Sequence, residues 1–83
     1  MDYKVVVPKS VQESLNSLQK RYRDQVYVAL KALERSPLLG KKLWGQYKAY
    51  RSLRTGDYRV IYQVRATELL ILVIKVGNRH GIY

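Results

Sequence analysis

The sequence predicts an α+β fold, in the order β-α-α-β-β-β, in which a helical hairpin packs on one face of a mainly antiparallel four-stranded sheet. Apolar residues recur at helical spacing in the first half of the chain, and the spacing changes to a period of two in the second half. A helical pair followed by several strands is typical of two packed layers. Because 83 residues are too few for a second core, we expect residues 1–83 to form one domain.

The first half predicts one short strand and two helices. Residues 3–7 are rich in valine and precede a proline, which is typical of a short strand. Ser10 and Glu13 fit a capping box for the first helix, and Asp24 is expected to begin the second. Pro37 should end that helix, because the residue before a proline avoids helical conformation. The expected buried faces are Val11, Leu15, Leu18 and Tyr22 in the first helix, and Val26, Ala29, Leu30 and Leu33 in the second. With only two or three residues between them, the helices should form an antiparallel hairpin.

The second half predicts a loop and three strands. Residues 38–46 contain two glycines and a basic pair, which indicates a loop. Residues 47–54 and 58–65 flank a Thr-Gly-Asp turn and predict a β-hairpin. Residues 69–76 follow a second turn and are nearly all apolar, as in an interior strand covered on both faces. Within residues 58–65, alternation places Tyr58, Val60, Tyr62 and Val64 on one face and Arg59, Ile61, Gln63 and Arg65 on the other.

Basic residues greatly outnumber acidic ones. The chain has 16 Lys and Arg against 6 Asp and Glu, which gives a formal net charge of +10. Such an excess of charge repels itself in a small folded domain and is useful mainly for binding a polyanion. The expected partners are therefore nucleic acid, an acidic protein segment or an anionic membrane surface.

The chain lacks the residues that several other functions need. It has no cysteine, which excludes a disulfide scaffold, a thiol nucleophile and a Cys-ligated metal site. A single histidine excludes a multi-His metal site, so we expect no metal and no cofactor. The N-terminus lacks a signal-peptide pattern, and the longest apolar run, residues 69–74, is far shorter than the roughly 20 residues that span a bilayer. We therefore expect a cytoplasmic protein that does not enter a membrane.

The positive charge is concentrated between residues 41 and 65, where Asp57 is the only acid. Aromatic residues are interleaved with it, and this combination suits RNA, because guanidinium groups bind phosphate and rings stack on unpaired bases. The alternative is that the rings pack in the core, which the alternation favours for Tyr58 and Tyr62. We also expect Trp44 to cover the core. The candidate RNA-binding residues are Lys41, Lys42, Lys48, Arg54 and Arg65.

Two motifs resemble those of the RelE/ParE toxin superfamily. Residues 50–62 read YRSLRTGDYRVIY and resemble its signature hairpin, and residues 76–83 read VGNRHGIY and resemble its C-terminal motif. Residues 42–45 and the leucines at helical spacing also match the usual layout, so the similarity covers nearly the whole chain. The resemblance implies a RelE-like fold and a toxin of a type II toxin–antitoxin system.

The resemblance implies one of two toxic activities. RelE-type toxins cut messenger RNA on the ribosome without a metal: a 2′-hydroxyl attacks the adjacent phosphate and leaves a 2′,3′-cyclic phosphate and a 5′-hydroxyl. ParE-type toxins poison DNA gyrase and need no nuclease residues. We expect the first activity, with the ribosome, the mRNA and an acidic cognate antitoxin as partners and a toxin–antitoxin hetero-oligomer as the inhibited form. A gyrase inhibitor and an RNA-binding module without chemistry are the alternatives.

The family's catalytic positions fall on Arg59, Arg79 and Tyr83. Two guanidinium groups suit the charge that develops on the attacked phosphate. Proton transfer is then left to Tyr83 or His80, since arginine stays protonated. An arginine in the middle of a strand, as Arg59 is, requires an anion, a carboxylate or solvent.

The general base is not assigned by this resemblance. RelE-type enzymes carry basic residues on the strand before the turn, but those positions fall on Tyr50 and Ser52. Arg51 would replace them only if a bulge or a shifted pairing turned its side chain to the other face. Arg54, nearer to the turn, is a further possible catalytic residue.

Overall fold

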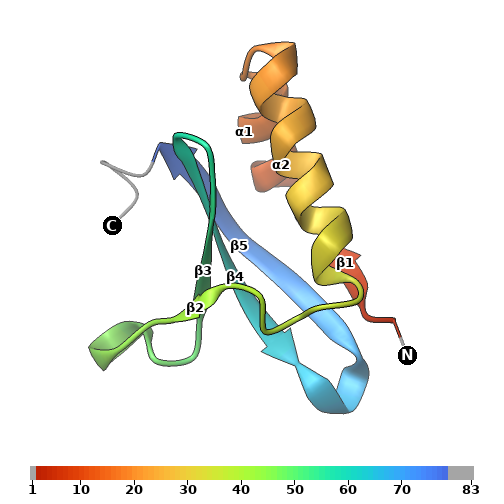
Figure 1. The fold of residues 1–83 in the computed structure, drawn as a ribbon, viewed down its shortest axis with the longest axis vertical. Helices are drawn as coiled ribbons and strands as arrows, with labels where there is room; N and C mark the ends of the chain where they lie inside the picture. Colours follow the sequence, from red (N-terminus) through yellow and green to blue (C-terminus); the bar gives the residue numbers. More distant parts are fainter. Residues whose placement is uncertain (1, 79–83) are drawn as a thin grey trace.

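Residues 2–78 are described by the computed structural model, and they form two helices and a five-stranded sheet (Figure 1). Helices α1 (Lys9–Asn16) and α2 (Lys20–Leu33) form the predicted hairpin, joined by residues 17–19. Each helix buries residues of the face that the sequence spacing indicates, among them Leu15 in α1 and Leu30 in α2, but Leu18 and Tyr22, expected in the first helix, lie in the connecting segment and in α2.

Both helices begin at other residues than expected. α2 begins at Lys20, and Asp24 lies within the helix, where its carboxylate is 3.3 Å from the Lys20 ammonium group. The capping box does not form, because Pro8 is the residue before α1 and its carbonyl oxygen accepts the first helical hydrogen bonds. Ser10 already lies inside the first turn and therefore has no capping role.

The sheet has five strands in the order β1-β5-β4-β3-β2. They are β1 (Lys4–Val6), β2 (Lys41–Lys42), β3 (Arg51–Thr55), β4 (Tyr58–Arg65) and β5 (Leu70–Asn78). β1 is parallel to β5, and the other neighbouring pairs are antiparallel. The two-layer α+β architecture is confirmed, but the expected number of four strands was wrong by one.

The additional strand comes from the segment expected to be a loop. Lys41 pairs with Ser52, and Lys42 pairs with Arg51. A 3-10 turn at Gly45–Tyr47 then delays β3, which begins at Arg51 instead of residue 47. A two-residue strand has no sequence signal of its own; it forms because the outer edge of β3 offers main-chain hydrogen-bonding groups.

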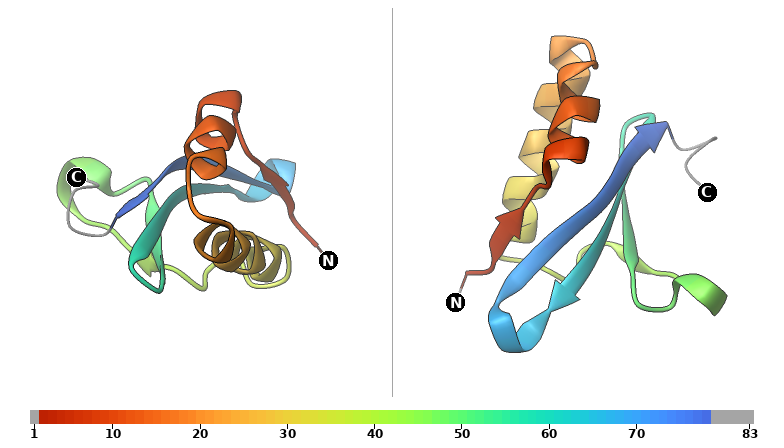
Figure 2. Two further views of the ribbon diagram at one scale, coloured as in Figure 1. Left: turned by 90° about the horizontal axis from the view of Figure 1, so that it is seen from above. Right: turned by 180° about the vertical axis from the view of Figure 1, so that it is seen from behind.

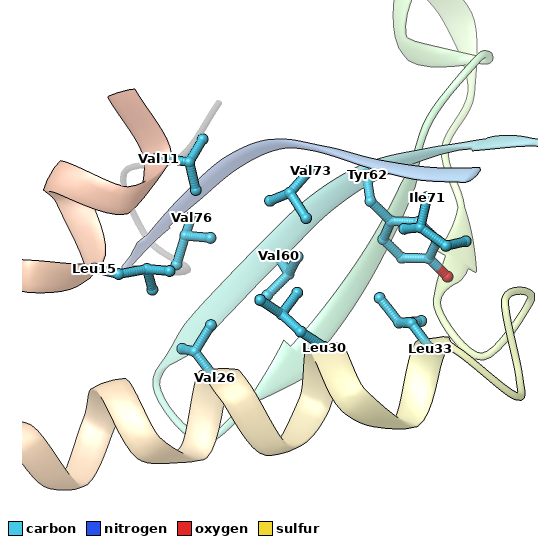
Figure 3. Close-up of a cluster of buried hydrophobic side chains, with 10 residues drawn as sticks. All are labelled: Val11, Leu15, Val26, Leu30, Leu33, Val60, Tyr62, Ile71, Val73 and Val76. Atoms are coloured by element: carbon cyan, nitrogen blue, oxygen red, sulfur yellow. The ribbon is translucent and has the colours of Figure 1, made fainter. Parts of the chain in front are cut away.

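The helices cover one face of the sheet only. Figure 2 shows both helices along one side of the molecule, with β2 and the segment around Gly45–Tyr47 at the opposite side. We refer to the sheet face turned away from the helices as the open face. Figure 3 shows the core on the other face, where helix and strand side chains converge: Val11, Leu15, Val26, Leu30, Leu33, Val60, Tyr62, Ile71, Val73 and Val76.

The hairpin between β3 and β4 turns at Gly56 and Asp57. Thr55 pairs directly with Tyr58, so only two residues form the loop. Gly56 has a φ of 62°, in the left-handed region. A positive φ at the first central position is typical of a type II′ turn and favours glycine there. The turn keeps β3 and β4 in regular register along their whole pairing.

The ladder between β4 and β5 contains one register shift. Ile61 pairs with Lys75, whereas the next residue of β4 pairs with Val73, so Ile74 is an extra residue on β5. The bulge allows Val73 and Val76 both to face the helices although they are three positions apart. The expectation that β5 is covered on both faces was wrong, because Ile74 is 39% exposed and Lys75 is exposed.

Tyr62 fixes the segment after α2 to the sheet. Its buried hydroxyl donates a hydrogen bond to the Pro37 carbonyl oxygen and accepts one from the Gly40 amide, both at 2.8 Å. A Cβ atom at Gly40 would lie only 2.7 Å from this hydroxyl oxygen, so the close approach requires glycine. Burial raises the pKa of the Tyr62 phenol. Tyr62 is thus a core residue, as predicted.

No helix within residues 2–78 is long and apolar enough to cross a membrane.

Candidate functional site

The open face is basic. Directly paired residues of neighbouring strands share a face, so the register assigns Lys41, Ser52, Arg54, Arg59, Ile61, Gln63, Arg65 and Lys75 to this face. None of the five strands contains Asp or Glu. A surface with cations and no strand carboxylates attracts anions, so the open face is the candidate functional site.

Arg59 is held in the middle of this face. It is half-buried, and its Nη1 donates a hydrogen bond of 3.2 Å to Oγ of Ser52. Ser52 is itself 4% exposed. This contact orients the guanidinium. On β5, Gly77 pairs with Arg59 and places no side chain beside it.

A second arginine stands opposite the first. Arg54 of β3 is the direct cross-strand partner of Arg59, and its exposed Nε lies 3.5 Å from the Gly56 carbonyl oxygen. Like charges in this relationship destabilise a sheet. A phosphate or carboxylate bound next to the two guanidinium groups would offset that repulsion, so the pair favours the binding of an anion.

Arg51 does not belong to this site. It pairs with Tyr62, a core residue, and therefore lies on the helix side of the sheet. Its Nη1 donates a hydrogen bond of 2.8 Å to the Gly40 carbonyl oxygen. A catalytic role would require a bulge or a shifted pairing that turns the Arg51 side chain to the open face, but the pairing of β3 with β4 contains no shift. The condition under which Arg51 was expected to act in catalysis is therefore not met by this register, and its side chain instead holds the segment before β2.

The three predicted RNA-binding lysines differ in position. Lys41 pairs with Ser52 and belongs to the open face. Lys42 belongs to the opposite face, and its ammonium group is 6.0 Å from the ring centroid of Trp44. Lys48 is exposed in the segment before β3. Only Lys41 therefore lies on the same surface as the two arginines.

Arg65 shares the face but not the immediate site. It lies six positions after Arg59 along β4, which corresponds to about 20 Å. Its guanidinium contacts the side chains of Gln63 (3.1 Å) and Glu68 (3.8 Å). Arg65 can therefore contact only a distant part of a long ligand.

The aromatic residues divide between core and surface. Tyr58 packs against the core, with its ring centroid 5.4 Å from that of Tyr22, as expected. Trp44 is 77% exposed, so the expectation that it covers the core was wrong. It immediately precedes the 3-10 turn, in the segment that stands away from the helices (Figure 2).

Three predicted site residues lie outside the described part of the chain: Arg79, His80 and Tyr83. β5 ends at Asn78, which pairs with Tyr58, the neighbour of Arg59. Their catalytic roles stay predictions that come from the resemblance.

Other features do not compete with the open face. An apolar hollow of about 220 Å³ between β1 and α2 is lined by residues such as Val5, Tyr27 and Leu30, and its charged lining residues, Lys31 and Glu34, pair with each other at 3.2 Å. Within residues 2–78, no group of three or more His, Cys, Asp or Glu side chains is arranged to hold a metal ion.

Sequence reasoning missed Lys75. Strict alternation from Ile71 and Val73, both in the core, would turn residue 75 toward the helices. A lysine is almost never buried without a partner, so its presence in this apolar run was a signal of a register break. The bulge at Ile74 is that break.

The family of the chain follows from a match over nearly its whole length. A model of the family described as the ParE toxin of the type II toxin–antitoxin system parDE matches residues 5–83. The chain belongs to this toxin family. It is a toxin of a type II toxin–antitoxin system, and the RelE/ParE superfamily indicated by the motifs is confirmed.

Solved structures of RelE-type toxins share the fold of this ParE-family toxin. The RelBE2 toxin–antitoxin complex from Mycobacterium tuberculosis is 26% identical, with a TM-score of 0.88 over 95% of this chain and 100% of that chain. The archaeal RelE–RelB complex from Pyrococcus horikoshii OT3 is 31% identical, with a TM-score of 0.82 over 98% and 99%. The intact E. coli RelBE complex, at 23% identity and a TM-score of 0.76 over 92% and 95%, shows the fold alone. No curated protein matches the chain by sequence.

Proposed function

We propose that this toxin is a metal-independent endoribonuclease that cleaves ribosome-bound mRNA and so inhibits translation. The observation that carries the proposal is the position of Arg59: half-buried, oriented by Ser52 and opposite Arg54 on a face whose strands contain no carboxylate. This is an arrangement for binding a phosphodiester, and RelE-type relatives at 26% and 31% identity support the choice of RNA.

The proposed reaction is an internal transfer of the phosphoryl group. The 2′-oxygen attacks the adjacent phosphorus as its proton is removed, the bond from phosphorus to the 5′-oxygen breaks, and the 5′-oxygen takes up a proton. Arg59 would bind non-bridging oxygens and stabilise the charge of the phosphorane. By the family resemblance, Arg79 would supply a second guanidinium, and Tyr83 or His80 would transfer a proton. Arg54, opposite Arg59, would bind the same phosphate or its neighbour.

An acidic antitoxin segment is the proposed inhibitor. Next to the cations, the open face carries half-buried or exposed apolar residues of β5, namely Leu70, Leu72 and Ile74. An amphipathic segment with carboxylates would cover both groups and neutralise the arginines that bind RNA. The toxin–antitoxin complexes of the M. tuberculosis and P. horikoshii relatives support this partner. The toxin–antitoxin complex should weaken as the salt concentration rises. The toxin would act in the cytoplasm.

Inhibition of DNA gyrase is the second candidate. Two observations favour it: the matching family model is that of ParE, and Ser52 and Tyr50 stand where RelE-type nucleases carry basic residues. Ser52 is buried and accepts a hydrogen bond from Arg59, so this position provides no cation at the surface.

Expression of the native toxin separates the two candidates. Mapping of RNA 5′ ends should reveal cuts in translated messages, in phase with codons, whereas DNA supercoiling by purified gyrase should be unaffected by the toxin. Inhibited supercoiling with intact messages would establish the gyrase activity instead. Arg35→Ala, at an exposed position just after α2, is the matched control for any arginine variant of the open face.

A further inference from the structure

The bulge in β5 determines where Lys75 lies. Ile74 and Lys75 together occupy the place opposite Ile61, so the strand gains one residue there. Val76 returns to the core at 9% exposure, while Lys75 is exposed and shares the open face with Ile61. Bulges are common next to active sites, where they re-aim a side chain.

The register brings Lys75 next to the arginine pair. Arg59 pairs with Gly77, and Lys75 precedes Gly77 by two positions on the same strand. Lys75 and Arg59 are therefore diagonal neighbours, and such residues are typically about 7–8 Å apart, within reach of long side chains. Gly77 places no side chain beside Arg59, whose guanidinium turns toward Ser52 on β3, so Ile61 lies between this guanidinium and Lys75 on the open face.

No carboxylate of the described residues occupies this place. The ion pairs within residues 2–78 join Lys20 to Asp24, Lys31 to Glu34 and Arg65 to Glu68, and none includes Lys75. The ammonium group of Lys75 thus remains available for an external anion. Its neighbour Ile74 is 39% exposed and keeps this part of β5 uncovered.

We propose that Lys75 forms a phosphate subsite for the RNA strand, next to the phosphate bound by Arg59. The inference rests on the proposed function and deepens it, because it names a second point at which the open face holds the RNA backbone. Lysine acts there as a point charge, without the two-pronged geometry of arginine. Its contribution is therefore to affinity and to the register of the strand, not to proton transfer.

The salt dependence of RNA binding tests the subsite. The probe is a short, fluorescently labelled single-stranded RNA with 2′-O-methyl groups, which cannot be cleaved because its 2′-oxygens are blocked. For a single strand, each neutralised phosphate adds about 0.7 to the slope of log K against log salt. We expect Lys75→Gln to lower the slope by about 0.7, so that between 50 and 200 mM salt it loses about 2.6-fold less affinity than the native toxin. Lys75→Arg should keep the native slope.

The matched control is Lys9→Gln, an exposed lysine at the start of α1, which should leave the slope unchanged. An unchanged slope in Lys75→Gln would overturn the subsite, as would a loss of affinity for an acidic antitoxin peptide with RNA binding intact. Cleavage of unmodified mRNA on programmed ribosomes by the native toxin tests the proposed function separately. A reduced slope in Lys75→Gln without any cleavage by the native toxin would uphold the subsite and refute the nuclease. Cleavage together with an unchanged slope would uphold the nuclease and refute the subsite.

Discussion

Arg54 and Arg59 are direct cross-strand partners on the face of the sheet that carries no helix. Two like charges in this relationship oppose folding, and a hairpin selected only for stability would not keep them. Arg59 is in addition oriented by Ser52, so the pair is not a random feature of a basic surface. We interpret the pairing of Arg54 with Arg59 as a feature that lowers the stability of the fold and favours the binding of an anion.

Removal of one charge of this pair should stabilise the toxin. We expect Arg54→Gln to raise the free energy of unfolding by about 0.2–1 kcal/mol, because it ends the repulsion across the strands. The gain should shrink at high salt, where the repulsion is screened. Urea denaturation followed by circular dichroism measures it, with Arg35→Gln as the control that stays at the native value. A destabilised Arg54→Gln would show that the arginine pair has no such cost.

Loss of the Arg51 side chain should affect stability and not activity. Arg51→Met removes the 2.8 Å hydrogen bond to the Gly40 carbonyl oxygen, and we expect it to destabilise the fold by about 1.5–3 kcal/mol. Because Arg51 lies on the helix side of the sheet, the folded fraction should cleave mRNA at the native rate. Cleavage per folded molecule, measured below the melting temperature, is the decisive quantity. A loss of about 10²-fold or more in that quantity would show that Arg51 takes part in catalysis.

The hydroxyl of Tyr62 should be important for stability. Tyr62→Phe leaves the Gly40 amide and the Pro37 carbonyl without their buried partner, and we expect it to destabilise the fold by about 1–3 kcal/mol. Tyr27→Phe, at a tyrosine that is 44% exposed, is the control and should have little effect. Chemical denaturation measures both variants, and equal stabilities would contradict the assigned role.

The same hydroxyl should make the toxin sensitive to alkali. Burial raises the pKa of Tyr62 above its ordinary value of 10.0, so the folded state holds this proton more tightly than the unfolded chain does. The stabilisation is complete below about pH 10 and is lost as the pH rises through the folded-state pKa. Between pH 9 and pH 11, native stability should therefore fall more steeply than that of Tyr62→Phe.

The elements that follow from local signals were predictable. The apolar faces of the two helices predicted the helical hairpin, and the turn at Gly56 predicted the β-hairpin. β4 has the expected bounds. β2 was not predictable, because its two residues become a strand only when β3 offers an edge. The face of Arg51 was left open, because a one-residue slip between strands reverses every side chain and only the register decides it. The face of Arg59 was thus predictable from the alternation along β4, whereas the face of Lys75 depends on the bulge.

The bulge itself leads to an unusual deletion experiment. Deletion of Ile74 should leave a folded toxin, because it restores a regular ladder with Val73 and Val76 still in the core and Lys75 still on the open face. Deletion of Leu72 in the same strand should be clearly more damaging, because even if the bulge is lost it turns Val73 out of the core and puts Ile74 in its place. Thermal unfolding followed by far-UV circular dichroism compares them; fluorescence is unsuitable because the only tryptophan, Trp44, is already exposed. Equal damage by both deletions would show that Ile74 is not the extra residue.

The central claim is that Arg59 stabilises the phosphate during cleavage of mRNA. The most direct test is the rate at which Arg59→Ala cleaves mRNA on programmed ribosomes, compared with the native toxin and with Arg35→Ala. Loss of a preorganised donor to the phosphorane should reduce the rate by about 10²–10³, with the circular dichroism spectrum unchanged, and Arg35→Ala should cleave at the native rate. The products of the native toxin should end in a 2′,3′-cyclic phosphate. Cleavage by Arg59→Ala at the native rate, or no cleavage by the native toxin itself, would contradict the account.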